Sequence, residues 1–484
     1  MADFDSFIKS IHNEFGAQKK GKPFEKFCKW FLQNDPVWSK TVAKVWTWEE
    51  YPEKWQTDDL GTDLVFEDKA GLTWAVQSKC YSEQYSTTKT DMDSFLADSG
   101  RKQVHRRLWM QSTNRINAKA LKIIKNQDKP VTIYNLDDFR NAQVKYPSKF
   151  SELLTVERKK KPIPDLHQDK AIKDVISGLE DKKRGQLIMA CGTGKTFTTL
   201  WIKEGLKAKT TLVLLPSLNL LSQTLKEWAS AANFDFEILN VCSDKTVGNN
   251  QEDLDPSTAP FKVTADVNDI KEFLCKTNDK VIFCTYHSSI LIAEAQSDKK
   301  LPDFDLIICD EAHNCAGKVS SQFSIVLDEK RIRADKRLFT TATPRYFAES
   351  SKKVAVERNQ IVIGMDDQNI FGPKLHKLSF GEAINYKPEP LLNDYQVIVI
   401  GVDEPKIKHW IEDRNLVQTK FDKITDAELL GSKIGVIKAI KDYNLTRLIS
   451  FHSRVDRAKE FSAEFMGLLE LIKGLRTTLW ENTN

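Results

Sequence analysis

A six-residue run, CGTGKT from Cys191 to Thr196, constrains the fold of this chain more than any other feature. It follows the apolar segment 186–190, which predicts a strand, and it precedes a segment with helical spacing of apolar residues. Glycines at 192 and 194 let the backbone turn tightly, so that its N–H groups and the helix N-terminus can surround phosphate oxygens. The run therefore predicts a nucleotide-binding loop between a strand and a helix.

The loop also suggests a role for each of its side chains. Lys195 would reach the β- and γ-phosphates of ATP, and Thr196 would offer its hydroxyl to Mg²⁺. The other expected ATP contacts are Cys191, Gly192, Thr193 and Gly194. Met189 stands where the full motif has its first glycine, so a glycine-rich turn that binds no nucleotide is the alternative.

Apolar, β-rich runs recur through the middle of the chain, at 186–190, 211–215, 281–285, 306–309 and 338–341. Helical or loop segments separate them, which predicts a mostly parallel sheet covered by helices. The fourth run ends in DEAH, so two carboxylates come at the carboxyl end of a buried strand, where open α/β sheets bind ligands. Asp310 suits Mg²⁺, and Glu311 suits the orientation or deprotonation of an attacking water. His313 could couple the nucleotide state to neighbouring loops.

In this order the motifs resemble those of the superfamily 2 helicases and translocases. The further matching pieces are Gln168, LPSLNLLSQTLKEW (215–228), TYHS (285–288) and TATPR (341–345). The resemblance implies that Gln168 contacts the adenine, that 215–228 contacts DNA, and that Thr341 and Thr343 couple ATP hydrolysis to DNA movement. ACGTGKT together with residues 365–384 looks more specifically like the motor of bacterial restriction enzymes of Type I, Type III and the single-polypeptide Type I kind.

A second constellation lies before residue 150, in LGTDLVFEDKAGLTWAVQSKCY. Gln77 and Lys79 are two apart on a predicted strand, so both project from one face, and Asp63 can end an adjoining hairpin strand. A carboxylate, a second oxygen ligand and a lysine can hold Mg²⁺ beside a phosphodiester and stabilise an attacking hydroxide. An ordinary polar hairpin is the alternative.

This constellation resembles the PD-(D/E)xK superfamily, in the GxD…QxK form of the Mrr-like restriction nucleases. The segment GKPFEKFCKWFL (21–32) is similar to the first helix of that family, from which Glu25 could extend the acidic site. Segment 108–121 is similar to its later strand and helix. Gln77 departs from the usual acid of the superfamily, and a neutral amide is a weaker Mg²⁺ ligand.

The resemblances imply an α/β chain with three domains. A restriction-endonuclease-like α/β/α domain at 1–156 and a linker at 157–165, ERKKKPIPD, would precede a RecA-like parallel-sheet domain at 166–385. A partial second RecA-like lobe would occupy 386–484, with strands at 396–402 and 447–451. We find no candidate for the arginine motif that closes the ATP site in this family, and expect the carboxyl-terminal part to be cut short.

Global composition adds little to these motifs. With 72 Lys and Arg against 68 Asp and Glu, the net charge of +4 does not identify a nucleic-acid binder. The eight cysteines lack zinc spacing, and we find neither a signal peptide nor a membrane-spanning run, so a cytoplasmic location is expected.

The leading hypothesis is an ATP-dependent restriction endonuclease, or its N-terminal portion, that uses ATP and Mg²⁺ on double-stranded DNA. A methyltransferase or specificity module could come from a separate subunit or a missing region. The alternatives are a repair or remodelling helicase whose first domain only binds nucleic acid, and a non-catalytic remnant that binds ATP and DNA.

Overall fold

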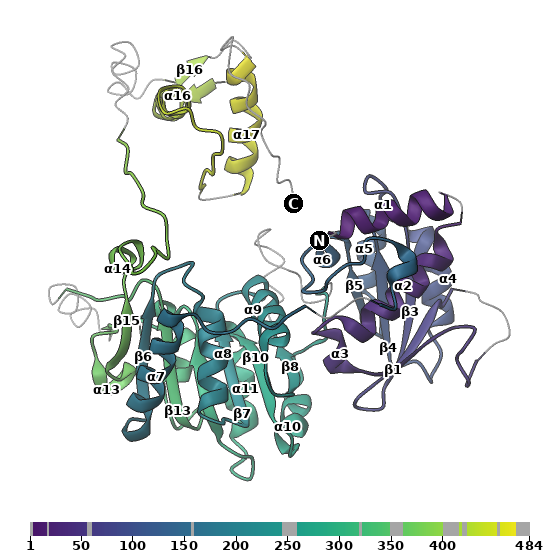
Figure 1. Cartoon of the computed structure of the whole chain (residues 1–484), viewed down its shortest axis with the longest axis horizontal. Coiled ribbons are helices and arrows are strands. Elements are labelled where there is room, and N and C mark those ends of the chain that lie inside the picture. Colours follow the sequence, from purple (N-terminus) through teal and green to yellow (C-terminus); the bar gives the residue numbers. More distant parts are fainter. Residues whose placement is uncertain are drawn as a thin grey trace. The chain divides into compact units, whose positions relative to one another are not determined.

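The chain forms two compact units, Met1–Leu392 and Asn393–Asn484, in the computed structural model. The described residues are 3–16, 19–55, 61–155, 159–243, 259–318, 322–348, 362–399, 416–418, 424–452 and 455–470. The first unit contains two separate sheets, one amino-terminal and one central (Figure 1). Residues 159–165 of the expected linker form neither helix nor strand and run between the two sheets in sequence.

The amino-terminal domain is built on a five-stranded sheet of order β1-β2-β3-β4-β5. Its strands are β1 (Val42–Thr47), β2 (Leu64–Asp68), β3 (Thr73–Lys79), β4 (Arg106–Gln111) and β5 (Val131–Tyr134). Its helices are α1 (Phe4–Phe15), α2 (Gly21–Asn34), α3 (Trp38–Thr41), α4 (Lys89–Asp98), α5 (Ala118–Lys125) and α6 (Leu136–Arg140). The first three strands pair antiparallel and the last three pair parallel.

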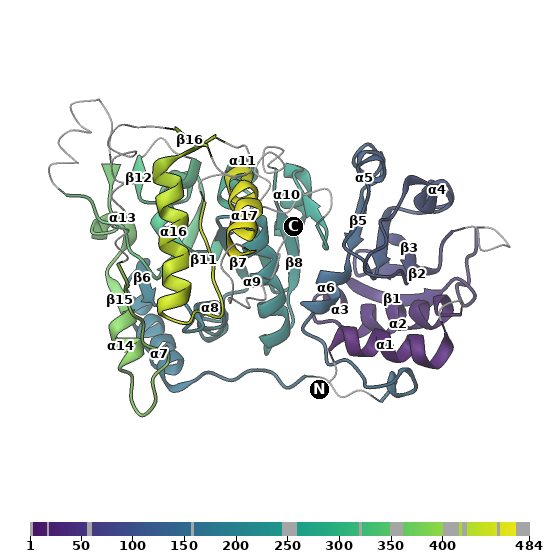
Figure 2. The same ribbon diagram turned by 90° about the horizontal axis from the view of Figure 1, so that it is seen from above.

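Helices cover both faces of this sheet, with α1 and α2 on one face and α4 and α5 on the other (Figure 2). The first face is strongly aromatic: the rings of Phe4 and Phe139 stack with centroids 4.7 Å apart, and Phe27 packs against both. Such rings bury large apolar areas and prefer offset or edge contacts, which fixes the helices against the sheet. The predicted α/β/α layering of this domain is thereby confirmed.

The central domain has an eight-stranded sheet of order β15-β6-β13-β11-β7-β10-β8-β9. Its strands are β6 (Arg184–Met189), β7 (Thr210–Leu215), β8 (Glu237–Val241), β9 (Val263–Thr264), β10 (Lys280–Thr285), β11 (Phe304–Cys309), β13 (Ala334–Thr341) and β15 (Lys374–Leu378). All its pairings are parallel. The five strands predicted from apolar runs are confirmed, each within a few residues of its expected bounds.

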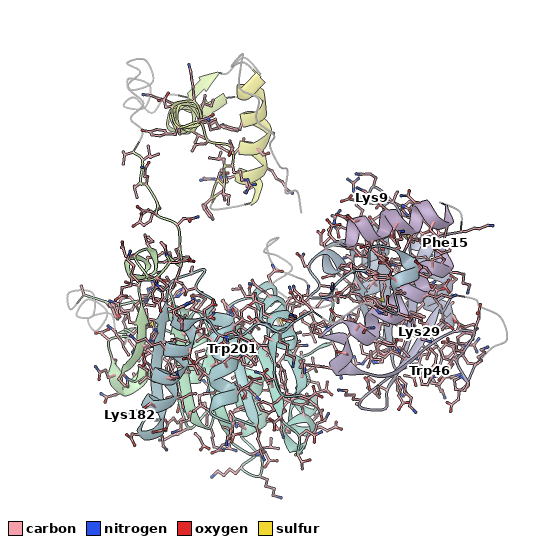
Figure 3. The ribbon with its side chains drawn as sticks, viewed as in Figure 1. Lys9, Phe15, Lys29, Trp46, Lys182 and Trp201 are labelled. Carbon is pink, nitrogen blue, oxygen red and sulfur yellow. The ribbon has the colours of Figure 1, made fainter. Side chains whose placement is uncertain are left out.

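Five longer helices and two short ones among the described residues accompany this sheet. They are α7 (Leu166–Asp181), α8 (Lys195–Gly205), α9 (Leu218–Ala231), α10 (Val267–Cys275), α11 (Ser289–Gln296), α13 (Gln368–Phe371) and α14 (Phe380–Ile384), with a short β12 (Gly317–Lys318) and β14 (Val362–Ile363) pair outside the sheet. Helices α7, α8 and α9 share one apolar core with the sheet, and α10 and α11 share the other. Trp201 of α8 is among the buried side chains (Figure 3).

The described elements of the second unit differ from those that the sequence predicts. Its described elements are β16 (Leu416–Gln418), β17 (Ile424–Asp426), α16 (Ala427–Asp442) and α17 (Val455–Glu470), with β16 and β17 pairing antiparallel. The strand predicted at 447–451 is wrong, because these residues are irregular and exposed. Residues 396–399 are also irregular, and 400–402 lie outside the described residues. A buried parallel strand needs paired neighbours, and the described part of this unit supplies only a short hairpin.

No helix among the described residues is both long and apolar enough to cross a membrane.

Candidate active sites

The strand order brings the expected ATP-binding motifs together. Strand β13 lies between β6 and β11, with Thr341 opposite Ile188 and Phe339 opposite Cys309. The segments that follow these strands therefore leave the sheet at one edge: the glycine-rich loop after β6, DEAH after β11, and the TAT segment at the end of β13. This is the edge at which parallel α/β sheets bind ligands.

The loop geometry depends on its glycines. Gly194 has φ of +79° and precedes α8 as its N-cap, a left-handed conformation that L side chains rarely adopt. A Cβ atom at this position would lie 2.2 Å from the Gln168 side-chain nitrogen. Thr193 is buried and donates its hydroxyl to the Ala190 carbonyl at 2.7 Å, which closes the turn. Cys191 is exposed at its outer side, and Gly192 also has a positive φ, +83°.

Gln168 lies beside the loop. Its side-chain oxygen accepts from the Asp165 backbone N–H at 2.8 Å, and its amide nitrogen lies 3.4 Å from the Gly194 carbonyl. The residue thus joins the start of α7 to the loop. Its expected contact with an adenine stays a prediction.

Two charged side chains meet across the edge of the sheet. Lys195 Nζ lies 3.1 Å from Glu311 Oε1, although 116 residues separate them in sequence. Glu311 has φ of +47°, unusual for a residue with a side chain, and such conformations cluster at functional sites. The ammonium group that is expected to meet a γ-phosphate is therefore held by a carboxylate.

Asp310 is held by hydrogen bonds, and its burial shifts its pKa. Thr340 donates its hydroxyl to Asp310 Oδ1 at 2.7 Å, and Tyr286 donates to the Asp310 carbonyl at 2.7 Å. Burial raises the pKa of Asp310, whereas the hydrogen bond from Thr340 and the charge of Lys195 lower it. The carboxylate of Asp310 and the hydroxyl of Thr196 are oxygen donors of the kind that Mg²⁺ prefers.

The residues expected to couple ATP hydrolysis to DNA movement form a contiguous polar cluster next to these groups. His313 Nδ1 lies 3.0 Å from Thr341 Oγ1 and 3.3 Å from Glu311 Oε2. Thr341 also lies 3.4 Å from Glu311 Oε2, and its hydroxyl accepts from the Thr343 backbone N–H at 3.1 Å. Glu311 is thus in direct contact with the TAT segment, and the expected coupling role stays a prediction.

Sequence reasoning missed two supporting residues of this site. Thr340, beside the predicted Thr341, fixes the Asp310 carboxylate, and Trp228 of α9 donates its indole N–H to the Thr196 carbonyl at 2.9 Å. The signal for Thr340 was its place in the run LFTTATPR, because neighbouring strand residues face opposite sides of the sheet.

The second constellation occupies the β2–β3 hairpin of the amino-terminal domain. Asp63 precedes β2 and is 8% exposed, while Gln77 on β3 is 2% exposed. Asp63 Oδ2 accepts from Gln77 Nε2 at 2.6 Å, from the Ser78 backbone at 2.7 Å and from the Ser78 hydroxyl at 2.9 Å. Asp63 and Gln77 are therefore in direct contact, and Ser78 is a positioning residue that sequence reasoning missed.

Gly61 explains how Asp63 reaches this position. Its φ is +141°, and a Cβ atom there would lie 2.8 Å from the Phe95 backbone nitrogen in α4. Only glycine lets the chain pass this close to the helix. The close approach of the backbone to α4 thus explains the glycine of the GxD motif.

Lys79 and Glu25 are half-buried, whereas Asp63 and Gln77 are buried. Lys79 ends β3 and is half-buried. Glu25, on α2, pairs with Lys22 at 3.1 Å and lines a cavity of about 580 Å³ that Asp63, Gln77 and Lys79 do not line. Burial raises the pKa of the Cys28 thiol, and the charges of Asp63 and Glu25 raise it further.

Among the described residues, no group of three or more His, Cys, Asp and Glu side chains is arranged to hold a metal ion. The nuclease constellation offers one carboxylate and an amide whose N–H₂ group faces it. Its roles as catalytic and Mg²⁺-binding residues stay predictions.

Two known families match separate parts of the chain. Residues 33–153 match the restriction endonuclease family Mrr_cat_2, and residues 161–346 match ResIII, the res subunit family of Type III restriction enzymes. The chain joins a restriction endonuclease domain to a helicase domain. The predicted resemblance to Mrr-like nucleases and superfamily 2 motors is confirmed.

A solved structure extends the likeness over nearly the whole chain. The ATP-dependent Type ISP restriction-modification enzyme LlaBIII, bound to DNA, is 27% identical, with a TM-score of 0.77 over 96% of this chain. The probable helicase A859L of African swine fever virus, isolate Tick/Malawi/Lil 20-1/1983, is 26% identical over 63% of the chain. The matched regions cover 31% of each of these relatives. The chain thus corresponds to about a third of their length.

Proposed function

We propose that this chain provides the nuclease and ATPase parts of an ATP-dependent restriction enzyme that acts on duplex DNA. The observation that carries the proposal is the convergence of Lys195, Asp310, Glu311 and Thr341 at one sheet edge, in a chain that also contains the Asp63–Gln77 pair. The DNA-bound Type ISP enzyme, similar over 96% of the chain, supports the same function.

In the helicase domain, Lys195 and the loop N–H groups would bind the phosphates of ATP. Thr196 and Asp310 would hold Mg²⁺, which neutralises phosphate charge when it is bound. Glu311 would orient or deprotonate the attacking water once the γ-phosphate competes for Lys195 and frees the carboxylate. His313 and Thr341, which contact Glu311, would pass this change to Thr343 and the following segment.

In the nuclease domain, Asp63 and Gln77 would hold Mg²⁺ and Lys79 would stabilise the attacking hydroxide. A cation beside Asp63 requires the carbonyl oxygen of Gln77 rather than its N–H₂ group. A half-turn of the amide provides that oxygen, since both ends of the amide have similar shape. Ser78 would keep Asp63 in place during this change because it donates twice to the same oxygen.

One observation favours a second candidate, a helicase whose first domain binds DNA without cutting it. Asp63 already accepts three hydrogen bonds at one oxygen, and Gln77 replaces an acid. The deciding experiment is plasmid nicking with Mg²⁺ and ATP by the wild-type chain and by Asp63→Asn. Nicking that depends on Asp63 supports the restriction enzyme; a wild-type chain that binds plasmid without nicking it supports the second candidate.

A further inference from the structure

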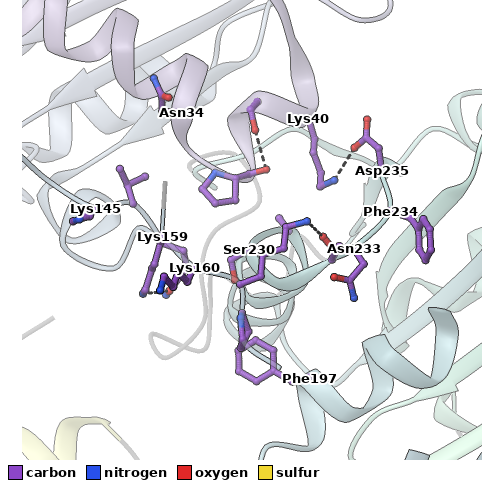
Figure 4. A pocket seen from close by; sticks show the side chains of 18 of the residues that line it. Asn34, Lys40, Lys145, Lys159, Lys160, Phe197, Ser230, Asn233, Phe234 and Asp235 are labelled. Atoms are coloured by element: carbon purple, nitrogen blue, oxygen red, sulfur yellow. Dashed lines mark hydrogen bonds and ion pairs between the residues drawn. The ribbon is translucent and has the colours of Figure 1, made fainter. Parts of the chain in front are cut away.

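A lysine-rich cavity of about 530 Å³ opens within the first unit, between elements of the nuclease and helicase domains (Figure 4). The nuclease domain contributes the end of α2, α3 and residues 143–145, and the helicase domain contributes the end of α9 and the residues that follow it. Six lysines line it, namely Lys40, Lys69, Lys145, Lys159, Lys160 and Lys161. Asp235 is the one acidic residue among the described residues that line it.

Two of these lysines form ion pairs with the Asp235 carboxylate. Lys40 Nζ lies 2.8 Å from one Asp235 oxygen and Lys69 Nζ lies 3.5 Å from the other. Lys40 also lies 4.4 Å from the centre of the Phe236 ring. This pairing occupies one side of the cavity, away from Lys145, Lys159 and Lys160 (Figure 4).

Two of the remaining lysines bind neutral acceptors. Lys159 donates to the side-chain oxygen of Gln143 at 2.9 Å, and Lys161 donates to the carbonyl oxygen of Ala232. Such bonds satisfy the ammonium groups without cancelling their charge. Lys160 is exposed beside them. Among the described residues of the lining, six ammonium groups thus face one carboxylate, a charge distribution that an anionic ligand would complement.

The form of the site favours a polyanion over a single nucleotide. A nucleotide site fixes phosphate with converging backbone N–H groups, as the loop at 190–196 does. Here the donors are separate ammonium point charges on long side chains, spread over two domains and a connecting segment. A ligand with several negative charges in a row would match the several lysine ammonium groups of the cavity. A phosphodiester backbone carries its charges in this way.

We propose that this lysine cavity binds the phosphate backbone of duplex DNA between the helicase and nuclease domains. The proposal rests on the proposed function, since a duplex that is moved by one domain and cut by the other must contact both. Lys145, Lys159 and Lys160 make these backbone contacts. Lys40, Lys69 and Asp235 hold the two walls together.

The test compares two triple variants in an Asp63→Asn background, so that no cutting interferes with binding. Lys145→Ala/Lys159→Ala/Lys160→Ala removes charge from the cavity. Lys299→Ala/Lys300→Ala/Lys330→Ala removes the same charge from exposed positions that precede β11 and β13, at the opposite edge of the sheet from the ATP motifs. Binding to a fluorescent 40-base-pair duplex is measured by anisotropy over a salt series, with thermal unfolding as a folding control.

We expect the cavity variant to bind the duplex on the order of 10- to 100-fold more weakly at 0.15 M salt, whatever the sequence. Three lost contacts should also flatten the slope of log affinity against log salt by about 2.7. The control variant should match its parent. Unchanged affinity and slope in a folded cavity variant would overturn the proposal.

A further measurement separates DNA from small phosphate ligands. ATP and inorganic phosphate are titrated into Lys195→Ala, with and without the cavity substitutions. Tight binding of either one that the cavity substitutions abolish, with duplex affinity unchanged, would assign the cavity to a small anion and overturn the DNA proposal. A parent chain that fails to bind duplex at all would contradict the proposed function itself, whereas a parent that binds equally with or without the cavity lysines would contradict only this inference.

Discussion

Lys195 and Glu311 come from loops 116 residues apart, whereas Asp63 and Gln77 are 14 residues apart on one hairpin. In the ATP site, a carboxylate faces a cation and the sheet order brings the two together. In the nuclease site, a carboxylate is held by three neutral donors from the adjacent strand. We therefore expect the first site to admit an anionic ligand that displaces Glu311, and the second to accept a cation only after the Gln77 amide has turned.

The largest expected effect lies in the nuclease site. Asp63→Asn should lower the rate of plasmid nicking by at least about 10³-fold, because it removes the only carboxylate of the Asp63–Gln77 pair. Lys79→Met should do the same by removing the cation that stabilises the attacking hydroxide. Gel analysis of nicked plasmid measures both. Glu67→Gln, at an exposed acid on β2, the strand that follows Asp63, is the matched control. Nicking by Asp63→Asn at the control rate would show that Asp63 is not part of a nuclease site.

Glu311→Gln should reduce ATP hydrolysis by about 10²- to 10⁴-fold while ATP still binds, because the amide keeps the shape but cannot act as a base. Phosphate release measures hydrolysis, and a fluorescent ATP analogue measures binding. If hydrolysis proceeds at the wild-type rate, Glu311 serves only as the partner of Lys195.

Lys195→Ala should weaken ATP binding by about 10- to 100-fold, since a charged hydrogen bond to phosphate is lost. Lys209→Ala, exposed after the same helix, provides the control in the analogue titration. Equal ATP affinity in both variants would show that the loop does not bind nucleotide.

Asp35, like Asp63, is a buried carboxylate that accepts from neutral donors, the backbone N–H groups of Val37 and Trp38. Burial raises its pKa to about 6, from 3.8 in an unfolded chain. The folded state therefore keeps a proton that the unfolded state releases between about pH 4 and pH 6. Stability falls as pH rises through this window, by up to about 3 kcal/mol, and stays lower above it.

Asp35→Asn removes this titration and keeps an oxygen acceptor for the same N–H groups. We expect the variant to be more stable than wild type at pH 7.5 and equal to it near pH 3.5, measured by urea unfolding at both pH values. The exposed Asp128→Asn serves as the control. A wild-type chain as stable as Asp35→Asn at pH 7.5 would show that the buried charge is fully compensated.

The smallest effect concerns Thr340. The hydrogen bond from its hydroxyl lowers the pKa of Asp310, so Thr340→Val should raise that pKa further. Asp310 must be ionised to hold Mg²⁺, and hydrolysis is lost as pH falls through its pKa. The acidic limb of the ATPase pH profile should therefore move to higher pH. A limb that stays in place would mean that Thr340 has no electrostatic role.

Local patterns and strand order account for what the sequence could predict. The strands of the central sheet are continuous apolar runs because both faces are covered, and the loop glycines mark backbone turns that other residues cannot make. Ser78 and Trp228 could not be assigned, since each acts through a contact set by packing. Residues 447–451 have the apolar composition of a strand, but composition does not supply the neighbour that a strand requires.

We propose that one chain carries two chemically separate sites, a nuclease site at Asp63 and an ATP site at Lys195. The most direct measurement determines plasmid nicking and ATP affinity together, with Mg²⁺ and ATP present, for wild type, Asp63→Asn and Lys195→Ala. We expect wild type to nick, Asp63→Asn to bind ATP as wild type does without nicking, and Lys195→Ala to lose ATP affinity. Nicking by Asp63→Asn at the wild-type rate, or wild-type ATP affinity in Lys195→Ala, would contradict the claim.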